Sequence, residues 1–480
     1  MKTKYIILWL YFMPIIALSQ SWSDPVTVYN DGYNESVDFT IDKNGSIHSV
    51  WAHKVETNYW KIFYSKSTDN GNTWSTAQDI SLNDNLWMSD PQIIADSNNN
   101  IYVSYDYNTG DPGNMLVFMK KFDGIQWQGT DTISTGLRGS MHSRLVVDKN
   151  NKIYCFWYRG KILYRTLENG IWSSVVQLYN GNDDHYFLKS VVIDNLNNIH
   201  CTGKYHYYGQ SGYGDRAMYF NCINGIWSDI TILSDNTTWR GPDIAVDSNN
   251  FPSITWGQFT SNSAPANHGT FVTSFDGSSW GVPQLLIEDS PEQHAIEIDQ
   301  FNKKYIVDLE KDTTGYQQVL YTNTLNNWSR EIIQQDNYGY YSHKLLEYDN
   351  KLYLMYIKVD TIFEQNGTFV FSRIQINKLD ILSGLPDYNT NLSLNISPNP
   401  FSNLTWINFE TTSFTNVQLK IHNLKGQIVN ILVNENKTQG KYSILWEGND
   451  LNGKEVSPGL YLVRLQIGRN VVTRSVILTQ

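Results

Sequence analysis

A turn closed by tryptophan recurs along the chain and constrains the fold more than any other sequence feature. Its clearest copy is Ser67-Thr68-Asp69-Asn70-Gly71-Asn72-Thr73-Trp74, which fits the pattern Ser-x-Asp-x-Gly-x-Thr-Trp. We expect a tight hairpin in which the Asp69 carboxylate accepts backbone N–H groups and Gly71 adopts a positive φ, while Trp74 packs between neighbouring strands. This turn is a structural element and carries no chemistry.

Degenerate copies of the turn follow at a regular interval. The recurring tryptophans are Trp22, Trp74, Trp127, Trp172, Trp227, Trp280 and Trp328. Successive positions lie 45 to 55 residues apart, which is the length of one four-stranded blade of a β-propeller. This regular spacing predicts a repeat protein. The turn itself resembles the Asp box of sialidase-type propellers.

A second pattern predicts a hairpin in every repeat. An apolar stretch ends in aspartate, and a short Asn/Gly/Lys turn leads into a strand rich in aromatic and β-branched residues. The aspartates are Asp42, Asp96, Asp148, Asp194, Asp247, Asp299 and Asp349. Together the patterns predict an all-β fold, a seven-bladed β-propeller with four strands in each blade. The last blade has a third strand near residues 369–373 but no tryptophan turn after it, so residues 22–29 are predicted to pair there and close the ring.

The chain is predicted to contain four segments. Residues 1–19 have a basic start and an apolar run, which indicates a secretory signal peptide; the alternative is a short membrane anchor, although the run falls short of the ~20 residues that a spanning helix needs. Residues 20–384 form the propeller, residues 385–392 a linker, and residues 393–480 a separate β-sandwich. No later segment could span a bilayer.

The last segment contains several ordered motifs. They are Asn395-Ile396-Ser397-Pro398-Asn399-Pro400-Phe401-Ser402, Ile421-His422-Asn423-Leu424-Lys425-Gly426, Trp446-Glu447-Gly448-Asn449-Asp450 and Pro458-Gly459-Leu460-Tyr461-Leu462-Val463. These residues resemble the C-terminal sorting domain of the type IX secretion system, a small Ig-like sandwich of exported Bacteroidetes proteins. The resemblance implies that the secretion machinery is a partner and that the chain is secreted or held at the outer cell surface.

Composition excludes several classes of function. The formal net charge of −11 and the absence of a lysine or arginine run argue against nucleic-acid binding. Three cysteines, Cys155, Cys201 and Cys222, are too few for a disulfide framework and are expected to be buried, with a Cys201–Cys222 bridge as the alternative. No metal-ligand spacing is present, so we expect no metal site and no required cofactor; a structural calcium ion is compatible but not indicated. We expect a monomer.

Candidate site residues lie before each first strand and after each second strand, because propeller loops converge there beside the central channel. Blade four is the richest, since Asp183-Asp184-His185 precedes its first strand and His206 ends its second. The loop of residues 207–216 follows, and its aromatic and glycine content suits a rim that stacks on sugars. The predicted substrate-binding residues are His142, Arg159, Tyr207, Arg216, Trp256, His294 and Lys358.

The blade-four pattern, Asp-Asp-His followed by Ile-His-(five residues)-His, resembles a group of seven-bladed propellers that includes ulvan-type polysaccharide lyases. In that group two histidines of one blade act with a tyrosine and an arginine of the next. His185 and His206 match, whereas the Tyr-Pro and Tyr-Arg elements are replaced by Gly241-Pro242 and Trp256-Gly257. We assign His185, His206, Tyr208 and Arg240 as the catalytic set.

The resemblance implies a secreted protein that cleaves an acidic, uronate-containing polysaccharide by β-elimination. Two alternatives stay open: a glycoside hydrolase, and a non-catalytic surface propeller that binds glycan or protein. A sialidase is disfavoured, because its arginine triad and its Phe-Arg-Ile-Pro motif are absent. His200 alternates toward the sheet interior and is expected to be structural.

Overall fold

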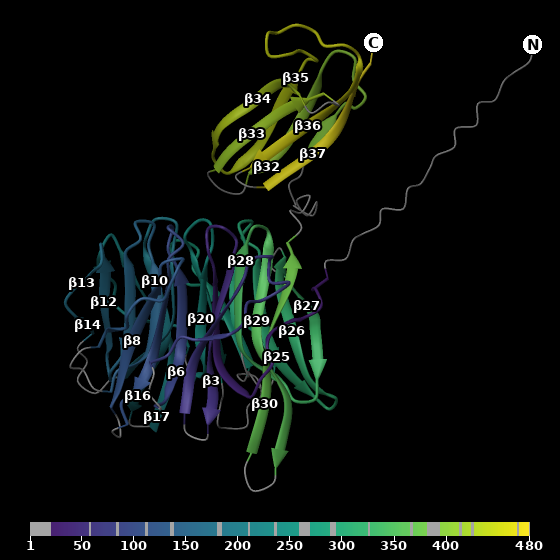
Figure 1. Ribbon diagram of the computed structural model, residues 1–480. Helices are drawn as coiled ribbons and strands as arrows, with labels where there is room; N and C mark the ends of the chain where they lie inside the picture. The colour runs from purple at the N-terminus through teal and green to yellow at the C-terminus, as the bar shows by residue number, and fades with distance from the viewer. Residues whose placement is uncertain are drawn as a thin grey trace, which may run out of the picture. The chain divides into compact units, whose positions relative to one another are not determined.

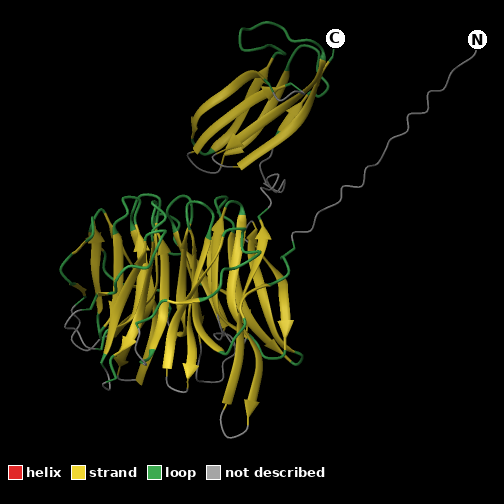
Figure 2. Cartoon of the chain, in the orientation of Figure 1, coloured by secondary structure: helices red, strands yellow, loops and turns green. Residues whose placement is uncertain are grey.

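The computed structural model describes residues 21–56, 59–82, 86–110, 114–134, 139–179, 185–209, 212–234, 238–258, 269–288, 294–324, 327–364, 368–381, 394–411, 415–423, 427–467 and 470–479. All regular secondary structure in these residues is β-strand (Figure 2). The chain divides into two compact units, Met1–Ile381 and Leu382–Gln480. Among the described residues, no helix is long and apolar enough to cross a membrane.

The described part of the first unit contains seven antiparallel sheets (Figure 1). The first has β2 (Tyr33–Ile41), β3 (Ile47–Glu56), β4 (Tyr59–Ser67) and β5 (Gln78–Asp79). The second has β6 (Met88–Ala95), β7 (Ile101–Asn108), β8 (Met115–Phe122) and β9 (Asp131–Thr132). The third has β10 (Met141–Val147), β11 (Ile153–Tyr158), β12 (Ile162–Glu168), β13 (Ile171–Trp172) and β14 (Val176–Leu178). The fourth has β15 (His185–Ile193), β16 (Ile199–Gly209), β17 (Gly212–Ile223), β18 (Ile226–Trp227) and β19 (Thr231–Ile232).

The other three sheets have four strands each. The fifth has β20 (Thr238–Val246), β21 (Pro252–Gln258), β22 (Gly269–Ser274) and β23 (Gln284–Glu288). The sixth has β24 (Ala295–Ile298), β25 (Lys304–Asp312), β26 (Gly315–Thr324) and β27 (Asn327–Asp336). The seventh has β28 (Tyr340–Tyr348), β29 (Lys351–Glu364), β30 (Thr368–Asp380) and β1 (Val26–Tyr29).

The first strands of these sheets form a closed sequence of neighbours. Strands β2, β6, β10, β15, β20, β24 and β28 contact one another in that order, and β28 contacts β2 again. Several hydrogen bonds join the last sheet to the first; for example, Val37 N donates to Ser342 Oγ at 3.0 Å, and Tyr341 Oη donates to the Asn34 carbonyl at 2.6 Å. The sheets therefore follow one another around a ring.

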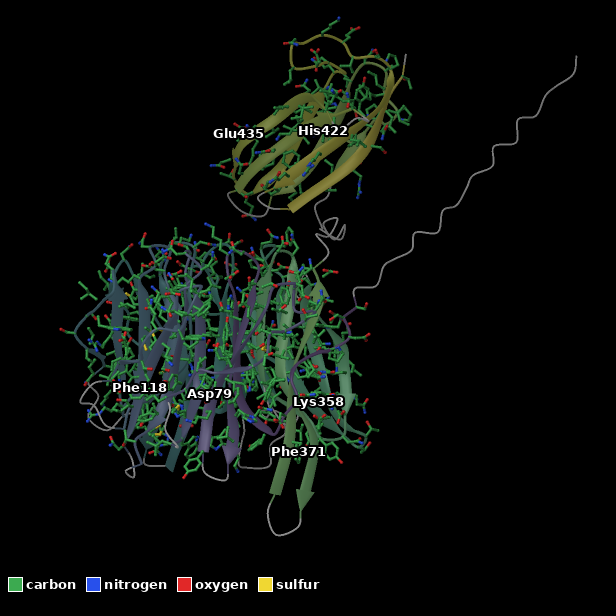
Figure 3. All side chains as sticks on the ribbon, viewed as in Figure 1. Asp79, Phe118, Lys358, Phe371, His422 and Glu435 are labelled. Atoms are coloured by element: carbon green, nitrogen blue, oxygen red, sulfur yellow. The ribbon has the colours of Figure 1, made fainter. Side chains whose placement is uncertain are left out.

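The N-terminal strand completes the seventh sheet, but not in the predicted position. β1 pairs with β30 through Val26 opposite Ile376 and Tyr29 opposite Ile374, rather than beside residues 369–373. The reason lies in burial, because Ile374 and Ile376 are fully buried whereas Phe371 is 47% exposed. Strands β29 and β30 run on past the buried part as a long hairpin that projects beyond the neighbouring sheets (Figures 1 and 3).

The turn between the first and second strands has a recurring structure. In the second sheet, Asp96 Oδ1 accepts the N–H groups of Asn98 and Asn100 at 2.9 and 2.8 Å. Six of the seven predicted aspartates accept hydrogen bonds in this way. The exception is Asp349, which forms a two-residue turn with Asn350, both at positive φ. Such a turn suits a tight hairpin and leaves no N–H for the carboxylate to cap.

Asparagines three residues after five of these aspartates link their sheet to the one before it. Asn151 adopts a φ of 64°, and its Oδ1 accepts the Ser97 N–H of the second sheet at 2.9 Å. We call this set of bonds the asparagine ladder. It also joins Lys43 to Asn99, Lys149 to Asn197, Asn195 to Asn250, and Ser248 to Asn302.

The turn of residues 67–74 has the predicted geometry. Asp69 accepts the Thr73 N–H at 2.9 Å and the Thr73 hydroxyl at 2.6 Å, and Gly71 has a φ of 79°. Trp74 packs against the cluster that also contains Trp51. The three cysteines are buried and free, and His200 is buried between Asp194 and Tyr219.

The second unit consists of two sheets around a common core. One sheet has β31 (Asn395–Ser397), β32 (Thr405–Thr411) and β35 (Gly440–Trp446); the other has β34 (Ile428–Lys437), β33 (Thr415–His422), β36 (Gly459–Ile467) and β37 (Asn470–Leu478). Their inner faces alternate with exposed residues along each strand, and Ile407, Leu419, Trp446 and Val463 are fully buried between them.

Candidate active site

Two histidines of the fourth sheet face one another at its inner edge. β15 and β16 are antiparallel, and His185 and His206 are direct cross-strand partners. Directly opposed residues project to the same side of a sheet, so both imidazoles share one face. Their ring centroids are 6.4 Å apart with an interplanar angle of 80°. The structure thus brings together the two histidines predicted to form the centre of the site.

An aspartate and a lysine accompany His206. Asp215 on β17 is the cross-strand partner of His206, and its Oδ1 lies 2.7 Å from His206 Nδ1. Lys204 Nζ lies 3.3 Å from the other carboxylate oxygen. A carboxylate at Nδ1 favours the tautomer in which Nδ1 carries the proton, which leaves Nε2 as an acceptor. His206 therefore has the arrangement of a general base.

A tyrosine from the third sheet accompanies His185. Tyr158 ends β11, and its Oη lies 3.0 Å from His185 Nδ1. The Tyr158 ring stacks on Phe187 with centroids 4.2 Å apart, which fixes the position of its hydroxyl. The pair combines an imidazole with a phenol, two groups that can exchange a proton.

Lys189 brings a positive charge to the same sheet. It follows Leu188 where the pairing of β15 with β16 is interrupted by a bulge, and its side chain packs against Gly241, where a Cβ would come within 2.7 Å of the lysine Cγ. Within the described residues, its ammonium makes no hydrogen bond or ion pair. Burial, reinforced by the Arg144 charge, lowers the pKa of Lys189 to about 8. Asp90, Asp215 and Lys204 are its other charged neighbours.

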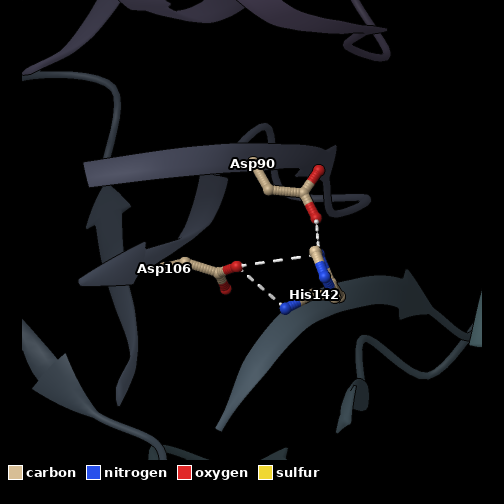
Figure 4. Close-up of side chains that lie close together, drawn as sticks. All are labelled: Asp90, Asp106 and His142. Carbon is tan, nitrogen blue, oxygen red and sulfur yellow. Dashed lines mark hydrogen bonds and ion pairs between the residues drawn. The ribbon is translucent and has the colours of Figure 1, made fainter. Parts of the chain in front are cut away.

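A second cluster lies on the two preceding sheets. His142 Nδ1 is 3.0 Å from Asp90 Oδ2 and 3.9 Å from Asp106 Oδ2 (Figure 4). Arg144 Nη1 also contacts Asp90 Oδ2, at 3.1 Å, and its Nε donates to the Lys189 carbonyl at 2.6 Å. Burial would raise the pKa of Asp90, but Arg144 and His142 outweigh it and hold that pKa below its usual range. Burial and the Asp90 charge raise the pKa of Asp106 well above its usual range.

The other predicted site residues are distributed around the ring. Arg216 is half-buried opposite Tyr205, Arg159 is exposed after β11, and His294 precedes β24 of the sixth sheet. Lys358 belongs to the seventh sheet (Figure 3) and pairs with Asp336 at 2.7 Å. The side chains of Tyr207, Tyr208 and Arg240 lie outside the described residues.

Two expectations about the site were wrong. Trp256 is only 1% exposed and stacks on Phe271, so its indole belongs to the core and presents no face to a sugar. The predicted loop of residues 207–216 is largely a hairpin, since β16 continues to Gly209 and β17 begins at Gly212. Because the strands continue, Asp215 is placed opposite His206, a partner that reading the segment as a loop could not reveal. Reading the segment as two strands and pairing residues outward from the turn would have identified Asp215 as the partner of His206.

The C-terminal unit matches a family model described as "Secretion system C-terminal sorting domain", over residues 395–479. This match indicates type IX secretion, either to the cell surface or out of the cell. No curated protein matches the chain in sequence.

Solved structures similar to the first unit include polysaccharide lyases. One is described as a new family of polysaccharide lyase, PL25 ulvan lyase, with 10% identity and a TM-score of 0.51 over 74% of this chain and 93% of that one. A second structure of that name is bound to -[GlcA(1-4)Rha3S]-, with the same values. Polysaccharide lyase Uly1 has 11% identity and a TM-score of 0.52 over 74% of this chain and 92% of its own. At such identities the likeness concerns the fold, which is all-β and propeller-like.

Proposed function

We propose that the first unit is a seven-bladed β-propeller that cleaves an acidic, uronate-containing polysaccharide by β-elimination at His185 and His206. The observation that carries this proposal is the pairing of the two histidines, each with its Nδ1 bonded to a different partner, Asp215 or Tyr158. Support also comes from a structural neighbour bound to a fragment that contains glucuronate. The second unit is proposed to be an Ig-like sorting domain.

In the proposed reaction, His206 Nε2 takes the proton at C5 of the uronate, next to its carboxylate. The electron pair of that C–H bond forms the C4–C5 double bond while the C4–O bond breaks. His185, bonded to Tyr158, gives a proton to the leaving oxygen. The products are a chain with an unsaturated uronate end and a chain with a free hydroxyl.

A cation is needed because the C5 proton becomes acidic only when the carboxylate charge is neutralised. Lys189 forms no ion pair within the described residues, and it lies on the same strand as His185. Arg240 and Arg216 are further proposed contacts to the carboxylate, and Tyr208 stays in the proposed catalytic set. His142 and Arg159, of the third sheet, are also proposed to contact the polymer. His294, which precedes the first strand of the sixth sheet, and Lys358, of the seventh sheet, are proposed to contact it farther around the ring.

The test is a panel of uronate polymers incubated with the full chain and read by the ultraviolet absorbance of unsaturated uronates. We expect one polymer to give this absorbance, and we expect His206→Ala and His185→Ala each to lower turnover by at least ~10²-fold. His422→Ala, in the sorting domain, is the matched control. If no polymer yields unsaturated product, or if both active-site variants retain full turnover, a binding propeller or a hydrolase replaces the lyase.

A further inference from the structure

Asp90, Asp106 and His142 form a cluster that takes no part in the proton transfers of the proposed lyase reaction. They come from three different strands, β6, β7 and β10, and so from two adjacent sheets. One potential ligand atom of each residue lies within 4.8 Å of the other two. Figure 4 shows both carboxyl groups directed toward the His142 imidazole. Ligand atoms around one metal ion, with bonds of about 2.0–2.4 Å, have separations of this size.

Asp106 is the member that indicates a missing partner. Its side chain is only 1% exposed, and its Oδ2 accepts the His142 N–H at 2.9 Å. Its Oδ1 is buried and has no hydrogen-bond partner in the described residues. A buried carboxylate oxygen without a donor or a cation costs several kcal/mol or forces protonation, so native structures rarely leave one.

The nearby arginine, Arg144, forms its ion pair with Asp90 and not with Asp106. Arg144 Nη1 donates to Asp90 Oδ2 and to the Ser143 carbonyl, and Arg144 Nε donates to the Lys189 carbonyl. In the described part of the chain, Asp106 forms no ion pair with a lysine or an arginine. The direct ion pair of Arg144 therefore goes to Asp90, and, among the described residues, the buried Asp106 is stabilised only by backbone N–H groups and by more distant charge.

We propose that Asp90, Asp106 and His142 bind one divalent transition-metal ion. Two carboxylates and one imidazole suit Mn²⁺ or Zn²⁺, which accept mixed oxygen and nitrogen ligands and complete their shell with water. Ca²⁺ fits less well because it takes six to eight oxygen ligands. Water can reach the site, since the His142 side chain is 39% exposed and that of Asp90 is 21% exposed.

The ion would join the second and third sheets. Its predicted effect is on stability, because an ion that binds only the folded state raises the free energy of unfolding. Neither His185 nor His206 supplies a ligand, but His142 is also a proposed contact to the polymer, so the test below measures metal binding and stability and not turnover.

The test uses the full chain without an affinity tag, treated with a chelator and then titrated with MnCl₂, ZnCl₂ or CaCl₂. We expect one Mn²⁺ or Zn²⁺ per chain by calorimetry, bound at least tenfold more tightly than Ca²⁺, and a higher melting temperature. Asp106→Asn and His142→Gln should each weaken binding at least tenfold. The control is Asp79→Asn, an exposed aspartate of the first sheet that should change nothing.

A readout on the unaltered protein guards against variants that fail to fold. Bound Mn²⁺ should show electron spin-echo modulation from a directly coordinated imidazole nitrogen. Lack of any binding at millimolar metal overturns the proposal. So does a spectrum that contains only water and oxygen ligands, or equal affinity in folded Asp106→Asn.

Discussion

Asp215 Oδ1 lies 2.7 Å from Nδ1 of His206, directly across the β16–β17 hairpin. This contact fixes the ring and its tautomer, so that the opposite nitrogen faces away from the carboxylate. Asp215 is therefore a positioning residue. Replacing it should leave the His206 imidazole in place but no longer hold its orientation and tautomer.

Asp215→Asn is therefore expected to lower kcat by roughly 10- to 100-fold on the cleaved polymer, with KM little changed. The amide cannot stabilise the imidazolium that forms when His206 accepts a proton, so the acid limb of the pH–kcat profile should also shift. Steady-state kinetics across pH measures both effects. Asp229→Asn, an exposed change in the same sheet, is the control. An increase in KM alone would contradict the positioning role.

Lys189→Met should separate binding of the uronate from folding. The methionine keeps the apolar packing against Gly241 but removes the charge, so KM for the polymer should rise about tenfold or more while the melting temperature stays near that of the natural chain. Lys43→Met, an exposed lysine in a turn of the first sheet, is the control. Unchanged kinetics in the Lys189 variant would assign carboxylate recognition to the arginines instead.

Asn151→Ala should reduce the free energy of unfolding by about 1–2 kcal/mol. The substitution removes the hydrogen bond from Ser97 N and places an alanine at a φ of 64°, which asparagine tolerates better. Urea denaturation of the two variants Asn151→Ala and Asn150→Ala makes the comparison, because Asn150 is exposed and its side chain makes no hydrogen bond of this kind. Equal midpoints would show that the ladder adds no stability.

Acid should destabilise the first unit partly through His48. Burial lowers the pKa of His48 to about 4, against about 6.5 in the unfolded chain. Between these values the unfolded state binds more protons, so stability is present above pH 6.5 and falls as the pH drops toward 4. His48→Gln should flatten this part of the stability–pH curve, as measured by denaturation at pH 4 to 7. A curve as steep as before would assign the acid sensitivity to other groups.

A chain that ends near residue 385 should keep the melting transition of the first unit. The two units have separate cores, and the sandwich core contains only residues from Leu394 onward. Calorimetry of the shortened and full chains makes the comparison. A large fall in the transition temperature would mean that the boundary is misplaced.

The sequence was sufficient to predict features that depend on neighbours along one sheet. Hairpins follow from alternating residues and turn chemistry, and the meeting of His185 with His206 follows from antiparallel pairing. Contacts between sheets were missed. The Tyr158 hydroxyl contacts His185 from the third sheet, and the repeat period of the sequence does not say which residues of neighbouring sheets come into contact.

Bulges explain most of the remaining omissions. Asp90 adopts a positive φ at an irregularity of β6, and Arg144 and Lys189 lie beside bulges of β10 and β15. An extra residue in a strand reverses the side to which later side chains point, so simple alternation assigns them to the wrong face. The bulges are the reason that Asp90, Arg144 and Lys189 were not predicted, whereas His142 was.

The asparagine ladder is interrupted at the two junctions of the seventh sheet with its neighbours. Five steps use a backbone N–H and an asparagine oxygen, but the sixth uses the Gln300 side chain with Asn350, and the seventh uses the Tyr348 hydroxyl with the Lys43 carbonyl at 3.4 Å. The same seam is where β1, from the other end of the chain, completes the seventh sheet. At these turns the seventh sheet is therefore held to both neighbours by side-chain donors, and its fourth strand comes from the start of the unit, so the ring closes only when both ends of the unit have been brought together.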